Sequence, residues 1–336
     1  MAIPSPRNPR RVTLTDVAAA CGVAPSTVSR ALSNPNRVSP AMYERIVRKA
    51  RDMGYRSAAL PDDRDRMARG SVALVLPNLS NPFNLDVIRG SQAQAQAAGY
   101  LHLLVSTEES VHVETTWLME LSRTVDGVVL ASPRADDAVI RDMADNVPLV
   151  VLNREIEGLP GVLIDTPSGL AQSLDYLVSL GHRRIAYVRG PATSWSDRTR
   201  FEALTNAAAA HGVELLPVGS FQPSLASGAA AADAVALTSA TASIFFNDTL
   251  AIGALQRFRR LGIAVPGRMS VVGCDDIFGA SFAHPPLTTV TSPGERAGRD
   301  VTDLLIGRLA TRDRNRRVDR IAAHLSVRET TGPSPE

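Results

Sequence analysis

Several features that are common in enzymes and secreted proteins are scarce or missing in this sequence. Cysteine occurs only twice, at Cys21 and Cys274, without a CxxC pair, so we expect no disulfide framework and a reducing compartment. The only lysine is Lys49, which leaves no Walker A loop, and HExxH and GxSxG motifs are absent. No GxGxxG follows a predicted strand. The sequence therefore predicts no catalytic residue, no metal ligand and no cofactor, and an enzyme is disfavoured.

Long apolar stretches are also absent, since no run of 18 apolar residues occurs. The first eleven residues, MAIPSPRNPRR, are rich in Pro and Arg and lack the apolar region of a signal peptide. We therefore expect a cytoplasmic protein. A transport-type binding protein, which would need export, is disfavoured.

Charge is distributed unevenly along the chain. The first 56 residues carry ten basic and three acidic residues, a formal charge of +7, and the remaining 26 basic and 31 acidic residues give −5. A basic head on a mildly acidic body indicates a polyanionic partner for the head, although a solvated basic tail would give the same asymmetry. A protein that coats DNA without specificity would be basic throughout, and this body is not.

Residues 12–56 are predicted to form three short helices. Thr13 and Asp16 have the spacing of a capping box, so a helix should begin at Leu14 with Val17 on its buried face. Gly22 then supplies the tight turn of a helix-turn-helix.

The second helix is predicted from Pro25 to about Leu32, with Pro in its favoured first position. At about 100° per residue, two faces separate. The packing face comprises Thr27, Val28, Ala31 and Leu32, and the outward face comprises Pro25, Ser26, Ser29 and Arg30. Small polar residues with one Arg suit the major groove, where Arg can bind guanine O6 and N7 together.

The third helix is predicted to begin after the cap Ser39 and to run to Met53, before Gly54. Four basic side chains on it are candidates for phosphate contacts, or are simply solvated: Arg45, Arg48, Lys49 and Arg51.

The run VTLTDVAAACGVAPSTVSRALSNPNRVSPAMYERIVRKARDMGYR resembles the headpiece of the LacI/GalR family of DNA-binding regulators. The resemblance rests on TLTDVA, GV, STVSRALSN, RVS and GY at the family's spacing. It implies base-reading roles for Pro25, Ser26 and Arg30, and backbone contacts for Thr13, Thr27 and Asn34. Thr13 could instead act only as a helix cap, and Asn34 only in a turn.

The segment SAALPDDRDRMARGS after the head departs from the family pattern. The family usually has a hinge helix that inserts a Leu into the minor groove. Here Pro61 follows Leu60 directly, and Arg64 occupies the position expected for the inserted Leu. Arg64 could enter a narrow minor groove from a shortened helix, and a disordered linker is an equally economical interpretation.

From Gly70 onward, short apolar runs alternate with longer amphipathic segments, which is typical of an α/β fold with two parallel-sheet lobes. We expect strands at residues 71–77, 101–105, 126–132, 148–153, 184–190, 242–247 and 270–276. We expect helices near residues 83–98, 112–123, 167–180, 198–211, 224–239, 248–261 and 293–309. Ligands of such sheets bind beyond the carboxyl ends of the strands, so a ligand cleft is expected there.

The body resembles the sensor domain of the same family, which is related to periplasmic sugar-binding proteins, through NLSNPF, DGVVL, PLVVLNRE, GHRRIAYVRG, FNDTLAIGAL, GIAVPGRMSVVGCDD and PPLTTV. The resemblance implies effector contacts by Phe83, Asn153, Arg154, Arg200, Asn247 and Asp275, with Asn81 and Trp195 as further candidates. A neutral sugar or polyol would use such donors, acceptors and aromatic faces. Alternatively, Phe83 packs a helix start, Asn81 caps that helix, Arg200 is a surface residue, and Trp195 is a lid or a surface residue in a loop.

The resemblance covers roughly residues 12–329 and implies a helix-turn-helix headpiece joined to a two-lobed domain like a periplasmic binding protein. The predicted organisation is a basic tail at 1–11, a DNA-binding domain at 12–56, a linker at 57–70, an effector and dimerisation domain at 71–329, and a tail at 330–336. The expected partners are palindromic operator DNA, a sugar or polyol effector and a second copy of the chain. Helices near 83–98 and 248–261 are candidate dimer contacts or solvated faces.

Overall fold

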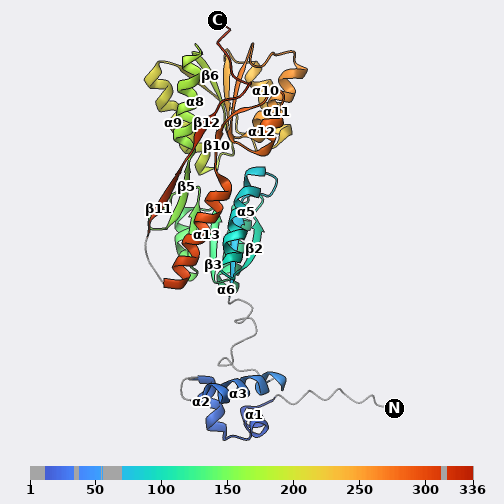
Figure 1. Ribbon diagram of the computed structural model, residues 1–336, viewed down its shortest axis with the longest axis vertical. Helices are drawn as coiled ribbons and strands as arrows, with labels where there is room; N and C mark the ends of the chain where they lie inside the picture. Colours follow the sequence, from blue (N-terminus) through green and yellow to red (C-terminus); the bar gives the residue numbers. More distant parts are fainter. Residues whose placement is uncertain (1–11, 34–37, 54, 56–69, 312–315, 336) are drawn as a thin grey trace, which may run out of the picture. The chain divides into compact units, whose positions relative to one another are not determined.

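The computed structural model describes residues 12–33, 38–53, 55, 70–311 and 316–335. The chain divides into two compact units, Met1–Arg69 and Gly70–Glu336 (Figure 1). The first unit contains the three helices that the sequence predicts for the head, namely α1 (Leu14–Cys21), α2 (Pro25–Ser33) and α3 (Pro40–Asp52).

The start and end of α1 follow from its sequence as predicted. The backbone N–H of Thr13 donates to the Asp16 carboxylate at 2.8 Å, its hydroxyl donates to the same oxygen at 2.7 Å, and the capping box is complete. Gly22 ends the helix with φ +65°, a left-handed conformation that glycine adopts without steric cost.

A small hydrophobic core holds the three helices together. Its fully or nearly buried members are Val17, Ala18, Cys21, Val28, Ala31, Leu32, Ile46, Val47 and Ala50. Tyr55 packs against this cluster. Such a core is small, so each buried aliphatic side chain contributes a large share of the stability of the unit.

The second unit has two lobes, each built on a six-stranded sheet. The first lobe has the strand order β11-β5-β4-β3-β1-β2, and all its paired strands are parallel. Its strands are β1 (Ser71–Leu76), β2 (Leu101–Ser106), β3 (Gly127–Ala131), β4 (Leu149–Leu152), β5 (Gly161–Asp165) and β11 (Val318–Ala322). Its helices are α5 (Pro82–Ala97), α6 (Val111–Thr124), α7 (Asp137–Asn146) and α13 (Gly294–Thr311).

The second lobe has the strand order β12-β10-β9-β8-β6-β7, and β12 alone pairs antiparallel. Its strands are β6 (Arg184–Val188), β7 (Glu214–Val218), β8 (Ala242–Phe245), β9 (Ser270–Asp275), β10 (Thr288–Thr291) and β12 (His324–Ser326). Its helices are α8 (Thr166–Ser179), α9 (Trp195–His211), α10 (Leu225–Ala236), α11 (Asp248–Arg260) and α12 (Phe278–Phe282).

The chain passes between the lobes at three points, which follow from the order of the elements. These are β5 to α8, β10 to α13, and β11 to β12 (Figure 1). Three adjacent crossings form a natural hinge, because each lobe can then move as a rigid body.

Close helix packing in the first lobe depends on two glycines. A Cβ on Gly90 of α5 would lie 1.9 Å from the carbonyl oxygen of Glu295, and one on Gly298 of α13 would lie 2.1 Å from that of Val87. Only glycine allows α5 and α13 to approach this closely.

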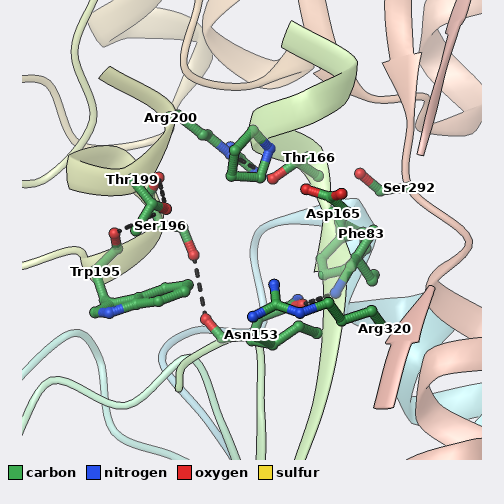
Figure 2. Close-up of a pocket in the computed structure, with 13 residues that line it drawn as sticks. Phe83, Asn153, Asp165, Thr166, Trp195, Ser196, Thr199, Arg200, Ser292 and Arg320 are labelled. Atoms are coloured by element: carbon green, nitrogen blue, oxygen red, sulfur yellow. Dashed lines mark hydrogen bonds between the residues drawn. The ribbon is translucent and has the colours of Figure 1, made fainter. Parts of the chain in front are cut away.

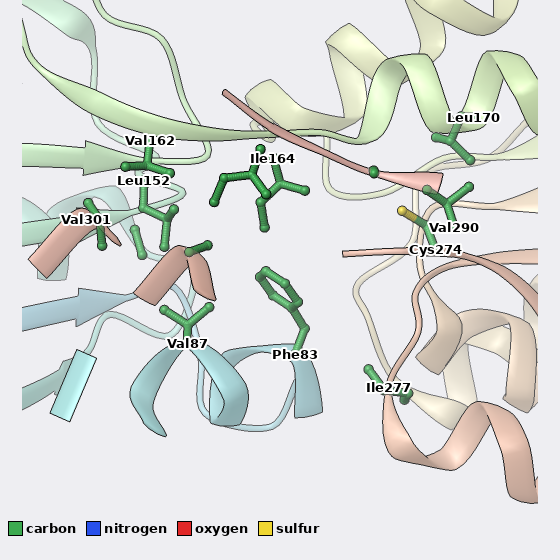
Figure 3. Packing of buried hydrophobic residues seen from close by; sticks show 14 of the residues in the cluster. Phe83, Val87, Leu152, Val162, Ile164, Leu170, Cys274, Ile277, Val290 and Val301 are labelled. Atoms are coloured by element: carbon green, nitrogen blue, oxygen red, sulfur yellow. The ribbon is translucent and has the colours of Figure 1, made fainter. Parts of the chain in front are cut away.

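One buried hydrophobic cluster extends through both lobes. It contains Val87 and Leu152 of the first lobe and Cys274 and Ile277 of the second. Figure 3 shows the ring of Phe83 between these two groups. Phe83 is therefore a packing residue at the junction of the lobes as well as a residue near the cleft.

All seven predicted strands and all seven predicted helices of the body are present, but several short elements were missed. The missed strands are β5, β7, β10, β11 and β12, and the missed helices are α7 and α12. Most of the missed strands are short or lie at a sheet edge, and β7 contains Pro217, which weakens a strand pattern. Trp195 is not in a loop, because α9 begins there and not near residue 198.

Candidate nucleic-acid interface and ligand cleft

The second helix of the head has the two faces that its sequence predicts. Val28, Ala31 and Leu32 are buried, and Thr27 is half-buried. Exposed positions on the other face are Pro25, Ser26, Ser29 and Arg30. The Arg30 guanidinium donates from Nε to the carbonyl oxygen of Ser26 at 3.2 Å and from Nη2 to its hydroxyl at 3.3 Å. These contacts hold the guanidinium on the outward face.

Other predicted DNA contacts have different surroundings. Thr13 caps α1 with its side chain and is itself exposed. Arg45, Arg48 and Lys49 are all exposed, and Arg45 also donates to the carbonyl oxygen of Cys21 at 3.1 Å, at the end of α1. Asn34 and Arg64 lie outside the described residues.

Two adjoining pockets lie between the lobes of the second unit, at the carboxyl ends of the strands. The outer pocket has a volume of about 30 Å³ and includes Asp165, Thr166, Trp195 and Arg320 (Figure 2). The inner pocket has a volume of about 50 Å³. A cavity needs roughly 10–15 Å³ to hold one water molecule, so the cleft in this structure holds a few. A sugar-sized ligand requires the lobes to move apart.

Most of the effector-contacting residues that the sequence predicts lie together in this cleft. Both pockets include Phe83, Asn153 and Arg200, and the outer one also includes Trp195. The inner pocket adds Asn81 and Asp275. Six of the eight predicted effector residues therefore line one cleft.

The remaining two predicted residues do not line either pocket. Arg154 donates to the carbonyl oxygens of Pro133 and Ala135 at 3.0 and 2.8 Å and pairs with Asp137 at 2.5 Å. It thereby holds the loop between β3 and α7. Asn247 caps α11 by accepting from the backbone N–H of Leu250 at 3.1 Å, and its buried Nδ2 has no partner among the described residues.

Backbone strain is concentrated at the same edge of both sheets. Non-glycine residues with positive φ follow or end four strands: Glu108 (49°), Glu109 (61°), Ser132 (44°), Asn153 (57°), Asp275 (116°) and Asp276 (55°). Such conformations cost about 1–3 kcal/mol each and are retained where the surroundings enforce them, often at functional sites. Glu109, Ser132, Asn153 and Asp275 all line the inner pocket.

The centre of the second lobe's half of the cleft is a buried ion pair. Arg200 donates from Nε to the Thr166 hydroxyl at 3.0 Å and from Nη1 to the Phe246 carbonyl oxygen at 2.6 Å. Its Nη2 lies 3.6 Å from Asp275 Oδ1. Burial raises the pKa of Asp275 to about 6, while the Arg200 charge and a hydrogen bond from Asn81 oppose that rise.

A second buried carboxyl group lies behind the first. Asp248 accepts from the Thr289 hydroxyl at 2.6 Å and from the backbone N–H of Ile277 at 2.9 Å. Burial, with the charge of Asp275 as the next cause, raises the pKa of Asp248 to about 7. This aspartate begins α11 and secures the loop after β9, so its role in the cleft is indirect.

A hydrogen bond joins the lobes across the cleft. Ser196 Oγ of the second lobe donates to the carbonyl oxygen of Asn153 of the first at 3.4 Å (Figure 2). Asn81 of the first lobe also acts on the second, because its side chain lowers the pKa of Asp275. A ligand in the cleft would compete with these interactions or bridge the same groups.

Several cleft residues were not found from the sequence. They include Asn84, Glu109, Ser132, Arg134, Ser194 and Ser196. Glu109, Ser132 and Arg134 follow the predicted strands β2 and β3, so the rule that ligands bind beyond strand carboxyl ends would have identified them. Asn78, two residues beyond the end of β1, also lines the inner pocket.

The described residues contain no group of three metal-binding side chains. No helix in the described ranges is long and apolar enough to cross a membrane.

A helix-turn-helix unit followed by two parallel-sheet lobes with a cleft between them defines a ligand-controlled DNA-binding regulator. Residues 13–57 match the model of bacterial regulatory proteins of the lacI family, and residues 174–331 match a periplasmic binding protein-like domain. The chain belongs to the LacI family and is a sequence-specific DNA-binding transcriptional regulator with an effector domain.

Individual relatives support this assignment. The chain is 31% identical over 306 residues to the transcriptional repressor CytR of Escherichia coli, which covers 88% of this chain and 89% of CytR. It is 31% identical over 339 residues to the transcriptional regulator CelR of Thermobifida fusca, which covers 96% and 98% of the two chains.

Solved structures agree with these relatives. The CelR–cellobiose complex has a TM-score of 0.71 at 30% identity and covers 95% of this chain and 100% of that one. The lac repressor dimer on operator, at 23% identity and a TM-score of 0.73, shows the same fold across 96% of this chain and 100% of that one.

Proposed function

We propose that this regulator is a cytoplasmic repressor whose operator affinity is controlled by a neutral sugar or polyol bound in the cleft. The observation that carries the proposal is the pairing of charges there. Arg134 pairs with Glu109 at 2.7 Å, and Arg200 lies 3.6 Å from Asp275, so the inner pocket offers hydrogen-bonding groups without an unmatched charge. Such a site suits hydroxyl groups better than a phosphate or a carboxylate.

The aromatic residues of the cleft support a sugar in particular. Phe83 and Trp195 line the outer pocket, and Phe246 lines the inner one. Aromatic faces bind the apolar faces of sugar rings while polar groups bind the hydroxyls. The solved structure of one relative, CelR, is that of its complex with cellobiose.

A homodimer fits the exposed apolar side chains of both lobes. On β2, an edge strand, Leu101 is 68% exposed, and on α12 Phe278 and Phe282 are 71% and 81% exposed. Exposed apolar residues of this size commonly mark interaction surfaces. We propose that a second copy of the chain covers them, so that two headpieces read a palindromic operator. The helices α5 and α11, which the sequence indicates as candidate dimer contacts, precede β2 and α12 in the chain.

Selection of randomised duplex DNA by the purified protein, followed by sequencing, tests this function. The selection is run at one fixed salt concentration with and without a panel of neutral sugars, polyols and nucleosides. An enriched palindrome whose recovery changes with one neutral sugar or polyol supports the proposal. A palindrome whose recovery responds only to phosphorylated or carboxylated compounds contradicts the neutral-ligand assignment, and failure to enrich any motif contradicts operator reading by this headpiece.

A further inference from the structure

Arg134 presents an unused pair of N–H donors in the first lobe's half of the cleft. Its side chain is only 5% exposed and lines the inner pocket. Nε donates to Glu109 Oε2 at 2.7 Å, and Nη1 donates to the Ser132 carbonyl oxygen at 2.6 Å. Within the described ranges, Nη2 has no hydrogen-bond partner, and it is not among the fully buried orphaned atoms.

The position of this guanidinium is fixed from several sides. The Arg134 backbone N–H donates to both carboxylate oxygens of Glu114, at 3.1 and 3.0 Å, and Glu114 is buried. Glu109 in turn accepts from Asn78 Nδ2 at 2.7 Å. A donor held this firmly loses little entropy when a ligand binds it, which is the arrangement expected of a recognition residue.

Arg200 offers the matching group from the second lobe. Its Nε and Nη1 are occupied within that lobe, and its Nη2 lies 3.6 Å from Asp275, longer than a good hydrogen bond. Both arginines line the inner pocket. One arginine from each lobe therefore lines the same small pocket.

We propose that Arg134 is an effector-binding and specificity-determining residue, and that the effector bridges the Nη2 groups of Arg134 and Arg200 with its oxygen atoms. This inference rests on the proposed function. A ligand that bonds both lobes stabilises the lobe separation at which it can bridge them, and only such differential binding can shift the equilibrium between lobe arrangements. Arg134 is then the first lobe's anchor for the ligand.

Glu109, the partner of Arg134, determines which ligand charge the site accepts. Glu109 has the strained φ of 61° that brings its carboxylate to the guanidinium, so the arginine reaches the cleft already compensated. A carboxylate on the ligand would lie beside that of Glu109 and be repelled. Glu109 therefore excludes acidic sugars, and Arg134 selects a neutral one.

The first test compares Arg134→Gln with the wild type and with Arg123→Gln, a control on α6 of the same lobe whose side chain is 75% exposed. The probes are D-ribose, D-glucose, cellobiose and inositol, with dissociation constants measured by calorimetry on the full-length protein. For the best-binding probe, Arg134→Gln should weaken binding by roughly ten- to a hundredfold, as expected for a lost hydrogen bond to a charged group. The control should bind within about threefold of the wild type. Equal affinity of the two variants would overturn the assignment of Arg134.

A second test produces a gain of binding, which misfolding cannot imitate. The Glu109→Gln variant is compared with the wild type for the best-binding of D-ribose, D-glucose and cellobiose, and for the uronic acid made by oxidising a primary hydroxyl of that sugar. We expect the wild type to prefer the neutral sugar by at least about tenfold, and the variant to lose or reverse that preference. An unchanged preference would refute the role of Glu109.

The outcomes separate this inference from the function on which it rests. If the wild type binds a neutral sugar and Arg134→Gln binds it equally well, only the Arg134 assignment fails. If the wild type binds none of the neutral probes while still recognising its operator, the neutral-sugar assignment fails and Arg134 as its anchor fails with it.

Discussion

Replacement of Arg200 by Met should destabilise the second unit in a way that depends on pH. The substitution keeps an apolar stem of similar length but removes the charge beside Asp275. It also removes the donors to the Thr166 hydroxyl and the Phe246 carbonyl oxygen. The cost therefore has two parts, lost hydrogen bonds and an uncompensated buried carboxylate.

The two parts separate by pH. The pKa of Asp275 is raised by burial to about 6 in the folded protein, above its ordinary value of 3.8, so the ionised form is disfavoured by folding. Removing Arg200 raises that pKa further. At pH 5 the variant's Asp275 is protonated, and the loss is about 1–3 kcal/mol from unpaired polar groups. At pH 8 the variant's Asp275 must either ionise without its partner or hold a proton that the unfolded chain would release, and the loss rises to about 3–5 kcal/mol.

Urea unfolding followed by tryptophan fluorescence measures this loss cleanly. The two tryptophans, Trp117 and Trp195, both lie in the second unit, so the signal reports that unit alone. The double variant Arg200→Met/Asp275→Asn should recover about 0.5–3 kcal/mol at pH 8 relative to additivity. A loss that is equal at pH 5 and pH 8, together with additive single variants, would refute the argument that these two charges stabilise each other.

Three further outcomes follow from other parts of the molecule. Arg30→Ala should remove about 1–3 kcal/mol of discrimination between the operator and altered sites, while salt-sensitive binding to random DNA persists. An unchanged motif in a DNA selection would count against base reading by this residue. Gly298→Ala should lower the free energy of unfolding in urea by about 1–3 kcal/mol, because its Cβ would lie 2.1 Å from the Val87 carbonyl oxygen. An unchanged free energy of unfolding would contradict the close approach of α5 and α13. Burial lowers the pKa of His182 below its ordinary value of 6.5, so the stability that the neutral imidazole contributes is present above pH 6.5 and is lost as the pH falls below it. His182→Gln should flatten that part of the stability profile, and an identical slope in both proteins would be inconsistent with a buried neutral imidazole.

The regular, buried elements of this fold were predictable because their sequences follow one simple pattern each. The capping box of Thr13 and Asp16 and the left-handed Gly22 fix α1 locally, without help from the rest of the chain. The central strands β1, β3, β4 and β9 are mostly apolar and buried along their whole length, as expected for parallel strands covered on both faces.

The elements that were missed depend on distant partners. The strands β11 and β12 carry charged or exposed side chains, and they become strands only because β5 and β10 offer them an edge. Short edge strands have weak local signals, since tertiary pairing decides their conformation.

The cleft was only half predictable for a related reason. Asn81, Phe83, Asn153, Arg200 and Asp275 were indicated by the family resemblance and by strand-end positions, and they line the pockets. The first lobe's pair of Glu109 and Arg134 comes from two different loops, and only the fold brings the two side chains within 2.7 Å. The family resemblance likewise indicated Arg154, although its bonds are all to its own lobe's loop.

The central claim is that effector binding in the cleft and operator binding by the headpiece are coupled. The most direct test measures the operator dissociation constant with and without saturating effector, and the effector dissociation constant with and without saturating operator, at one salt concentration. Thermodynamic linkage requires the two ratios to be equal, and the account predicts equal ratios of about 5- to 150-fold. An effector that binds the cleft with the same affinity in the presence and absence of operator would contradict it.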